Sequence, residues 1–260
     1  MERTSGARIQ TSLSYALLPI FSTIPHFFFR HILVVSVFDR YSGRPFRTSR
    51  MTTFNDNMLW RYATKHFDPT KKLTDAQVED LIESARLSAS SYGLQPYKLF
   101  VTADAELRKK IRAAAYDQPQ VTDASHLMFF CAKTSVDAAY VDHYTAVIAK
   151  ARGVTVESLA GYRDMMAGSM KRMTEEQQKT WSQKQAYIAL GTLLAACAQA
   201  HIDACPMEGF DSAKVDEILG LSAMGLTSTV FCPVGFRAVD DKAATQKKAH
   251  LSRNDFVIER

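Results

Sequence analysis

The 260-residue sequence lacks the short motifs by which many enzymes hold nucleotides or metals. It contains no G-x-G segment, so neither a glycine-rich dinucleotide fingerprint nor a P-loop is present. H-E-x-x-H, EF-hand and G-x-S-x-G patterns are missing, and the seven histidines are scattered. These absences exclude the common zinc, calcium and serine-hydrolase sites, so the polar groups of this chain would have to act together on a bound cofactor.

Cysteine is also scarce. The four cysteines show no CxxC spacing, and three of them lie within apolar runs; they are Cys131, Cys197, Cys205 and Cys232. Such thiols are typically buried and reduced, which indicates a reducing compartment and no zinc site. We therefore expect a cytoplasmic protein.

Net charge is absent from most of the chain, although the whole sequence carries +5 and a pI near 9.0. Residues 1–50 contain seven arginines, no lysine and only two acidic residues, Glu2 and Asp39. Residues 51–260 therefore contain equal numbers of basic and acidic residues. The high pI gives no argument for a nucleic-acid surface.

The sequence changes character near Met51. Upstream, residues 9–29 are uncharged, but prolines, His26 and then Arg30 interrupt the run of about 20 apolar residues that a membrane helix needs. An arginine-rich, acid-poor segment is also typical of an organellar transit peptide. The third interpretation is an upstream translation without structural meaning, with Met51 as the working start. We favour the third because lysine, common in the body, is missing here. Residues 1–50 are accordingly assigned to an extension that is disordered or not part of the fold, and 51–260 to one domain without membrane association.

Periodicity in the body predicts one domain of mixed helices and strands, with more helix than strand. Thr74 to Gln77 forms a capping box before an apolar helical stripe. Helices are expected over 54–62, 74–89, 105–115, 136–151, 154–173, 181–202 and 211–219, and strands over 97–102, 127–132, 203–205 and 226–234. The segment Ala186–Ala198 is apolar almost all round, so it must be covered on every side by the core or by a partner subunit.

Four polar segments are candidates to bind an anion or a planar ring. Arg61 to Lys65 combines a rigid guanidinium with a mobile ammonium. The loop Ser90–Pro96 offers hydroxyls and an amide, the turn Pro206–Gly209 offers main-chain N–H groups, and the tail after Lys247 is basic. Each segment alone also has an ordinary explanation: a solvated helix end, a plain loop, a strand-to-helix connection with Asp211 as N-cap, and a solvated tail.

In this order along the chain, these segments resemble the signatures of FMN-dependent nitroreductases. The resemblance rests on Arg61-x-x-x-Lys65-x-Phe67-Asp68, Ser90-Ser91-x-x-x-Gln95-Pro96, Asp123-Ala124-Ser125-His126 and Pro206-Met207-Glu208-Gly209-Phe210-Asp211. It covers about the last four-fifths of the chain and is strongest to the bacterial oxygen-insensitive NAD(P)H nitroreductase/dihydropteridine reductase group.

The resemblance implies an α+β fold, a three-layer sandwich with a central mixed sheet between helices, in an intertwined homodimer with FMN at the subunit interface. It implies ping-pong reduction of nitroaromatics, quinones or similar electron-poor acceptors by NAD(P)H. Ser90, Ser91, Gly93 and Gln95 would come from the partner subunit. The cofactor-binding positions that it implies are Arg61, Tyr62, Ala63, Lys65, Ser90, Ser91, Gly93, Gln95, Asp117, Gln120, Pro206, Met207, Glu208, Gly209, Lys248 and His250.

Within that set, Arg61 and the tail would contact the phosphate, Lys65 the N1–C2=O edge of the ring, and the main chain of Glu208 and Gly209 the region of N5. The flavin carries the chemistry, so no catalytic side chain and no metal is expected. Lys65, Met165 and Met166 would face the substrate, the methionines as an adaptable lid. Methionines at helical spacing are also ordinary core residues.

The chain departs from many relatives at several positions. Tyr62-Ala63 stands where they have His-Ser, Gly93 replaces an Asn in the serine loop, and His250 replaces an Arg. Where some relatives have Asn and Lys before the Asp-Ala-Ser-His segment, this chain has Asp117 and Gln120. The neutral Gln120 leaves Lys65 as the main cation at the ring edge, which predicts a slightly lower flavin potential.

Two other functions remain open from the sequence. One is a dehalogenase or flavin-fragmenting enzyme of the same fold, although such enzymes usually carry an extra lid insertion and none is evident here. The other is a flavin-binding redox module without turnover.

Overall fold

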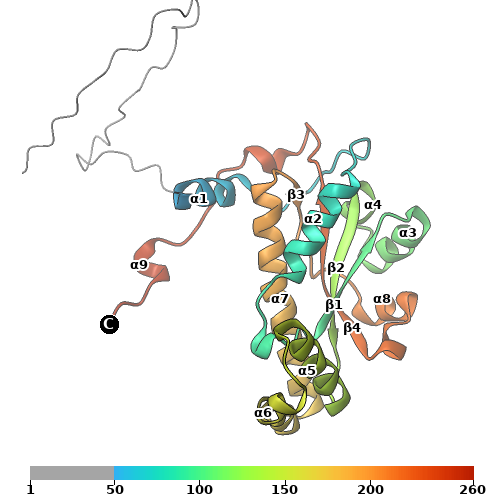
Figure 1. Ribbon diagram of the computed structural model, residues 1–260. Coiled ribbons are helices and arrows are strands. Elements are labelled where there is room, and N and C mark those ends of the chain that lie inside the picture. Colours follow the sequence, from blue (N-terminus) through green and yellow to red (C-terminus); the bar gives the residue numbers. More distant parts are fainter. Residues whose placement is uncertain (1–49) are drawn as a thin grey trace, which may run out of the picture. The chain divides into compact units, whose positions relative to one another are not determined.

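The computed structural model describes residues 50–260, and our interpretations of the preceding segment lie outside these residues. Figure 1 shows helices on both faces of a sheet. The helices are α1 (Arg50–Trp60), α2 (Asp75–Arg86), α3 (Ala105–Ala114), α4 (Gln120–Asp123), α5 (Ala138–Arg152), α6 (Ala160–Lys171), α7 (Glu175–Gln199), α8 (Ser212–Leu219) and α9 (Arg253–Phe256). The strands are β1 (Tyr97–Thr102), β2 (His126–Lys133), β3 (Asp203–Ala204) and β4 (Leu226–Gly235).

The four strands form one sheet in the order β1-β2-β4-β3, and every pairing between them is antiparallel. Parallel pairing occurs only as a single bridge between Ala63 and Ala204 among the described residues. That bridge adds the segment after α1 to the edge of the sheet at β3. The predicted α+β sandwich is confirmed, with the parallel part of its mixed sheet reduced to this bridge.

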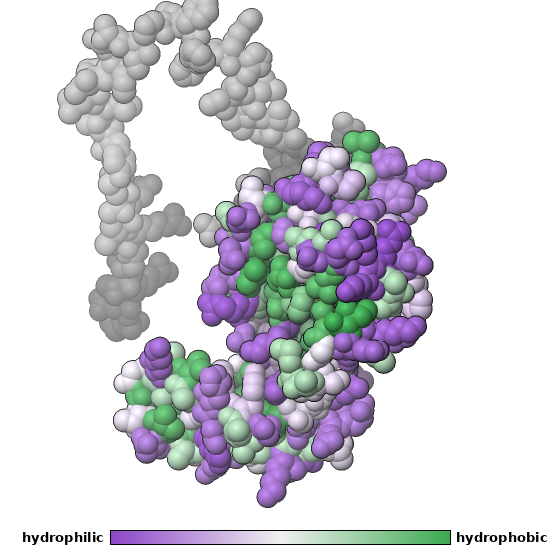
Figure 2. All heavy atoms as spheres, turned by 90° about the vertical axis from the view of Figure 1, so that its right-hand side faces the viewer, coloured by the Kyte–Doolittle hydropathy of each residue, from purple (hydrophilic) through white to green (hydrophobic). Residues whose placement is uncertain are grey.

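Alternation along the strands divides the core into two layers. Met128, Phe130 and Val230 face α2 and α7 on one side, where they pack with residues such as Leu193. Leu127, Phe129 and Phe231 face α3 and α8 on the other side. Figure 2 looks onto the face that carries α3 and α8 and shows apolar residues gathered near its middle, surrounded by hydrophilic ones.

Helix α7 is longer than its apolar pattern predicted. It begins after Thr174, whose capping box with Gln177 satisfies the first main-chain N–H groups, and its polar first turns carried no periodic signal. Its apolar part packs on β2 and β4, yet Ile188 is 47% exposed and Tyr187 39% exposed. The chain itself therefore leaves one stripe of α7 uncovered.

All four cysteines are free and buried, as predicted. Within residues 50–260, no helix is long and apolar enough to cross a membrane.

Candidate functional site

The turn after β3 is anchored at both ends. Met207 exchanges two main-chain hydrogen bonds of 2.9 Å with Phe231 of β4, and Phe210 stacks on the Phe231 ring with centroids 4.0 Å apart. Asp211 then caps α8 and donates its own N–H to the carbonyl of Ala114, 2.8 Å away. The residues between these anchors are consequently held in place without being part of a strand or helix.

Glu208 and Gly209 are these intervening residues. In the described part of the chain, neither main-chain N–H has a hydrogen-bond acceptor, whereas the carbonyl of Gly209 accepts from Gln118 Nε2 at 2.7 Å. A Cβ on Gly209 would lie 3.1 Å from the same nitrogen. The turn therefore presents two fixed, unused donors. The carboxylate of Glu208 accepts a hydrogen bond from the Tyr187 hydroxyl of α7, so the Glu208 side chain already has a partner outside the turn.

The segment Arg61–Lys65 lies beside β3, the strand that leads into this turn, about 140 residues away in sequence. Thr64 donates its N–H to Ala204 at 3.3 Å, next to the Ala63–Ala204 bridge. Burial raises the pKa of the Cys205 thiol, and the nearby positive charge of Lys65 opposes that rise. Among the described residues, neither the Arg61 guanidinium nor the Lys65 ammonium has an ion-pair partner. The segment that carries these two cations therefore pairs with the strand that leads into the turn with the two N–H donors.

Lys248 joins this group from the C-terminal tail. Its Nζ donates to the carbonyl of Met58 at 3.0 Å and to that of Arg61. Burial lowers the pKa of Lys248, and the charges of Arg61 and Arg237 lower it further. A phosphate dianion would relieve this crowding of positive charge. His250, predicted beside Lys248, is exposed.

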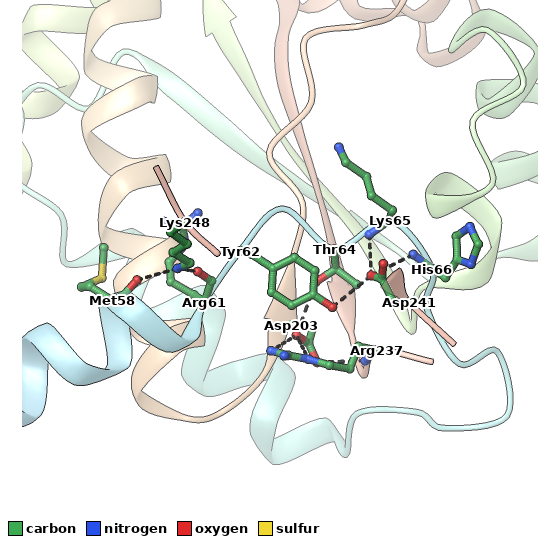
Figure 3. A network of polar contacts seen from close by, with 10 residues as sticks. All are labelled: Met58, Arg61, Tyr62, Thr64, Lys65, His66, Asp203, Arg237, Asp241 and Lys248. Carbon is green, nitrogen blue, oxygen red and sulfur yellow. Dashed lines mark hydrogen bonds and ion pairs between the residues drawn. The ribbon is translucent and has the colours of Figure 1, made fainter. Parts of the chain in front are cut away.

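A polar network behind the cations was not predicted from the sequence (Figure 3). The carboxylate of Asp241 accepts hydrogen bonds from the Tyr62 hydroxyl and from the Lys65 N–H, both 2.9 Å long. Burial and the bond to Asp241 raise the pKa of Tyr62 to about 12. Asp241 does carry a local signal, since it caps the short turn Lys242–Thr245, but nothing in the sequence pairs it with Tyr62.

The loop between α3 and α4 approaches the Glu208–Gly209 turn through Gln118. Asp117 adopts a left-handed conformation with φ 54°, and its neighbour Tyr116 does the same with φ 52°. Gln120 is buried, and within the described residues its Oε1 has no hydrogen-bond partner. The predicted position Asp117 therefore lies on a loop that touches the turn, and Gln120 begins the helix α4 that follows this loop.

The serine loop lies elsewhere in this chain. Ser91 donates its N–H to Gln185 of α7 at 2.7 Å, and the Tyr92 hydroxyl bonds with Ser169 of α6 at 3.0 Å. The Arg61 segment follows Trp60, which packs on His201 just beyond the C-terminal end of α7. At 1.5 Å per helical residue these two places on α7 are about 20 Å apart. Within one chain, the predicted residues Ser90, Ser91, Gly93 and Gln95 do not lie at the same part of α7 as the cations. That this loop contributes to the site of a partner subunit stays a prediction.

The predicted substrate-facing role of Met166 does not fit the structure. Met166 is fully buried and packs with Leu94, Val141 and Met170, so it belongs to the core beneath α6 and cannot form a lid. Its neighbour Met165 is 49% exposed and stays a predicted substrate-facing residue. Successive residues of a helix point about 100° apart, and the sequence spacing alone did not say which methionine faced which way.

Residues 58–236 match the model of the Nitroreductase family. The chain belongs to the nitroreductase family. It is 34% identical over 209 residues to the oxygen-insensitive NAD(P)H nitroreductase of Enterobacter cloacae, covering 77% of this chain and 96% of that protein. The corresponding enzyme of Salmonella typhimurium is 34% identical over 202 residues, covering 74% of this chain and 93% of the relative.

Solved structures agree on the fold. A nitroreductase family protein of Streptococcus pneumoniae superposes with a TM-score of 0.67 at 23% identity, covering 80% of this chain and 100% of that chain. A nitroreductase of Exiguobacterium sibiricum, solved in complex with FMN, gives a TM-score of 0.69 at 18% identity, covering 80% of this chain and 97% of that one.

Proposed function

We propose that this protein is an FMN-dependent NAD(P)H oxidoreductase that reduces nitroaromatics, quinones or similar electron-poor acceptors by ping-pong hydride transfer. Its family membership and its NAD(P)H nitroreductase relatives support the reaction class. The observation that carries the proposal is that the segment with Arg61 and Lys65 pairs with β3, the strand that leads into the turn with two unused N–H donors at Glu208 and Gly209.

The residues present fit FMN. Arg61 and Lys248 form a positive pair at the end of α1 suited to the phosphate, and Lys65 follows on the same segment. Bound FMN would supply hydride acceptance and donation at N5, so no protein general base is required. The ammonium of Lys65 would stabilise negative charge on the N1–C2=O edge, and the turn N–H groups would orient the ring near N5.

A homodimer would complete this site. The uncovered stripe of α7 at Ile188 and Tyr187 supports a subunit interface, because such an apolar stripe needs a cover. A second copy would also bring its own Ser90–Gln95 loop, which within one chain contacts α7 about 20 Å along the helix from the end near the Arg61 segment. The buried, free cysteines support a cytoplasmic location.

The first test is the colour and redox behaviour of the purified full-length protein. We expect a yellow protein that releases FMN on denaturation, is bleached rapidly by NADPH, and regains its colour on addition of a quinone. A flavin that NADPH bleaches and no acceptor reoxidises would favour a redox module without turnover. A colourless protein that takes up no added FMN would refute the proposal.

The second test separates main chain from side chain at the turn. Glu208→Gln should change the Kd for FMN little, because the Glu208 carboxylate is bonded to Tyr187. Gly209→Val should weaken FMN binding severely, because its Cβ would push against Gln118 where the ring approaches the main chain. Equal losses in titrations of the apoprotein would mean that the wrong atoms have been assigned.

A further inference from the structure

Asp241 connects the C-terminal turn to the segment that carries the cations (Figure 3). Its side chain is only 4% exposed. One oxygen, Oδ2, accepts from the Tyr62 hydroxyl at 2.9 Å, from the Lys65 N–H at 2.9 Å and from the His66 N–H at 3.2 Å. The other, Oδ1, accepts from the Ala243 N–H at 3.0 Å. All four donors converge on one carboxylate, which fixes the main chain at Lys65.

Tyr62 is held from a second side. The Arg237 guanidinium lies 4.5 Å from the centre of the Tyr62 ring and 4.3 Å from that of Trp60, so it is sandwiched between two aromatic rings. Arg237 is in turn fixed by Asp203, which accepts from its Nε at 2.7 Å and from its main-chain N–H at 2.8 Å. Ring and hydroxyl of Tyr62 are therefore both immobilised, and with them the residues that follow.

The Lys65 side chain, unlike its main chain, is not held by Asp241. In Figure 3 it points away from Asp241, and no carboxylate among the described residues pairs with it. A lysine side chain has four rotatable bonds, so only its anchored main chain limits the region that the ammonium can reach.

We propose that Asp241, together with Tyr62, is a positioning residue that aims Lys65 at the ring edge of FMN, and that it thereby tightens FMN binding and raises the potential of the bound flavin. This inference rests on the proposed FMN site. Both oxygens of Asp241 already accept hydrogen bonds from the protein, three of them from Tyr62 and from the main chain of Lys65 and His66, so it acts through Lys65.

The sign of the potential change separates this role from a simple charge effect. If Asp241 acted only as a nearby negative charge, its removal would favour the reduced, more negative flavin and raise the potential. If Asp241 acts by aiming Lys65, its removal withdraws a positive charge from the ring edge and lowers the potential. The two mechanisms predict opposite shifts.

The experiment uses Asp241→Asn, Tyr62→Phe and Lys65→Met in the full-length protein. The asparagine keeps the shape but turns an amide NH₂ toward one of the donors. Asp240→Asn is the matched control, because that neighbouring carboxylate is exposed and its one ion-pair partner within residues 50–260 is the His66 ring, 3.9 Å away. The measurements are the Kd for FMN by titration of the apoprotein, the Tm of the apoprotein, and the reduction potential of the bound flavin.

We expect Asp241→Asn to weaken FMN binding about tenfold and Tyr62→Phe about threefold, since the former loses charge-assisted hydrogen bonds and the latter a single one. Both should lower the flavin potential, and neither should lower it further when combined with Lys65→Met. A general loosening of the fold would lower the Tm and the affinity without this dependence on Lys65.

A potential that rises, that stays at the Asp240→Asn value, or that falls equally in the Lys65→Met background would overturn the inference. If Asp241→Asn does not fold, Tyr62→Phe decides by the same criteria. If Lys65→Met leaves both the Kd and the potential at wild-type values, the FMN site itself is misplaced. If Lys65→Met shifts both and Asp241→Asn matches its control, only the positioning role is refuted.

Discussion

Gly93, in the serine loop, should be among the least replaceable residues outside the core. Its φ is +74°, in the left-handed region that glycine adopts without strain, and Tyr92 (φ 57°) and Gln95 (φ 45°) share that region. A Cβ built on Gly93 would overlap the hydroxyl of Tyr144, whose Cζ would lie 3.3 Å away. Gly93→Ala therefore meets two separate penalties, one in the backbone and one in packing.

The two penalties can be estimated and measured separately. A left-handed conformation costs an L-residue about 1–2 kcal/mol, and overpacking costs about 1–3 kcal/mol more. Gly153 supplies the matched control, because its φ is +66° and no atom lies within 4 Å of its would-be Cβ. Gly153→Ala should show only the backbone part, and Gly93→Ala the sum, as free energies of unfolding from urea titrations of each variant.

Tyr144→Phe provides the rescue. In the described part of the chain the Tyr144 hydroxyl has no hydrogen-bond partner, so its removal alone should cost little. Combined with Gly93→Ala it should recover the packing part and leave the backbone part. If Gly93→Ala costs no more than Gly153→Ala, or if Tyr144→Phe rescues nothing, the overlap described here is wrong.

Three further outcomes follow from burial and charge. Arg237→Leu should cost about 3–5 kcal/mol in urea unfolding, because it leaves the Asp203 carboxylate, 5% exposed, without its counter-ion; a loss near zero would contradict the pairing. Met166→Ala should cost about 2–5 kcal/mol and leave acceptor preference unchanged, whereas Met165→Ala should change preference with little loss of stability; the reverse pattern would restore the lid. Burial alone would raise the pKa of Asp241, but hydrogen bonds from the N–H groups of residues 65, 66 and 243 and from the hydroxyl of residue 62 hold it below its usual value. A lowered pKa in the folded state stabilises the protein above the unfolded pKa of about 3.9, and this contribution is lost as the pH falls. The stability difference between wild type and Asp241→Asn should therefore shrink below about pH 4, and a constant difference in unfolding at several pH values would refute it.

Local patterns determined most of the elements. The capping box at Thr74, the N-cap at Asp211 and the apolar run of β2 each depend on residues within a few positions, so periodicity and capping residues were enough to predict them. The α+β class and the nitroreductase family were confirmed for the same reason, because the family signatures are short and lie on these local features. Where the local pattern was polar, as in the first turns of α7, the predicted boundary was wrong.

Only the tertiary structure decided how the segments meet. The pairing of the Arg61–Lys65 segment with β3, and the bond from Tyr62 to Asp241, join residues about 140 and 179 positions apart, and no local periodicity encodes such a contact. Burial chose between core and lid for Met166, since helical spacing serves both. The sequence by itself determined which groups this protein can offer a cofactor. The fold decided which of them are held together, because a carboxylate such as Asp241 can order a distant lysine only after the sheet has brought both to the same edge.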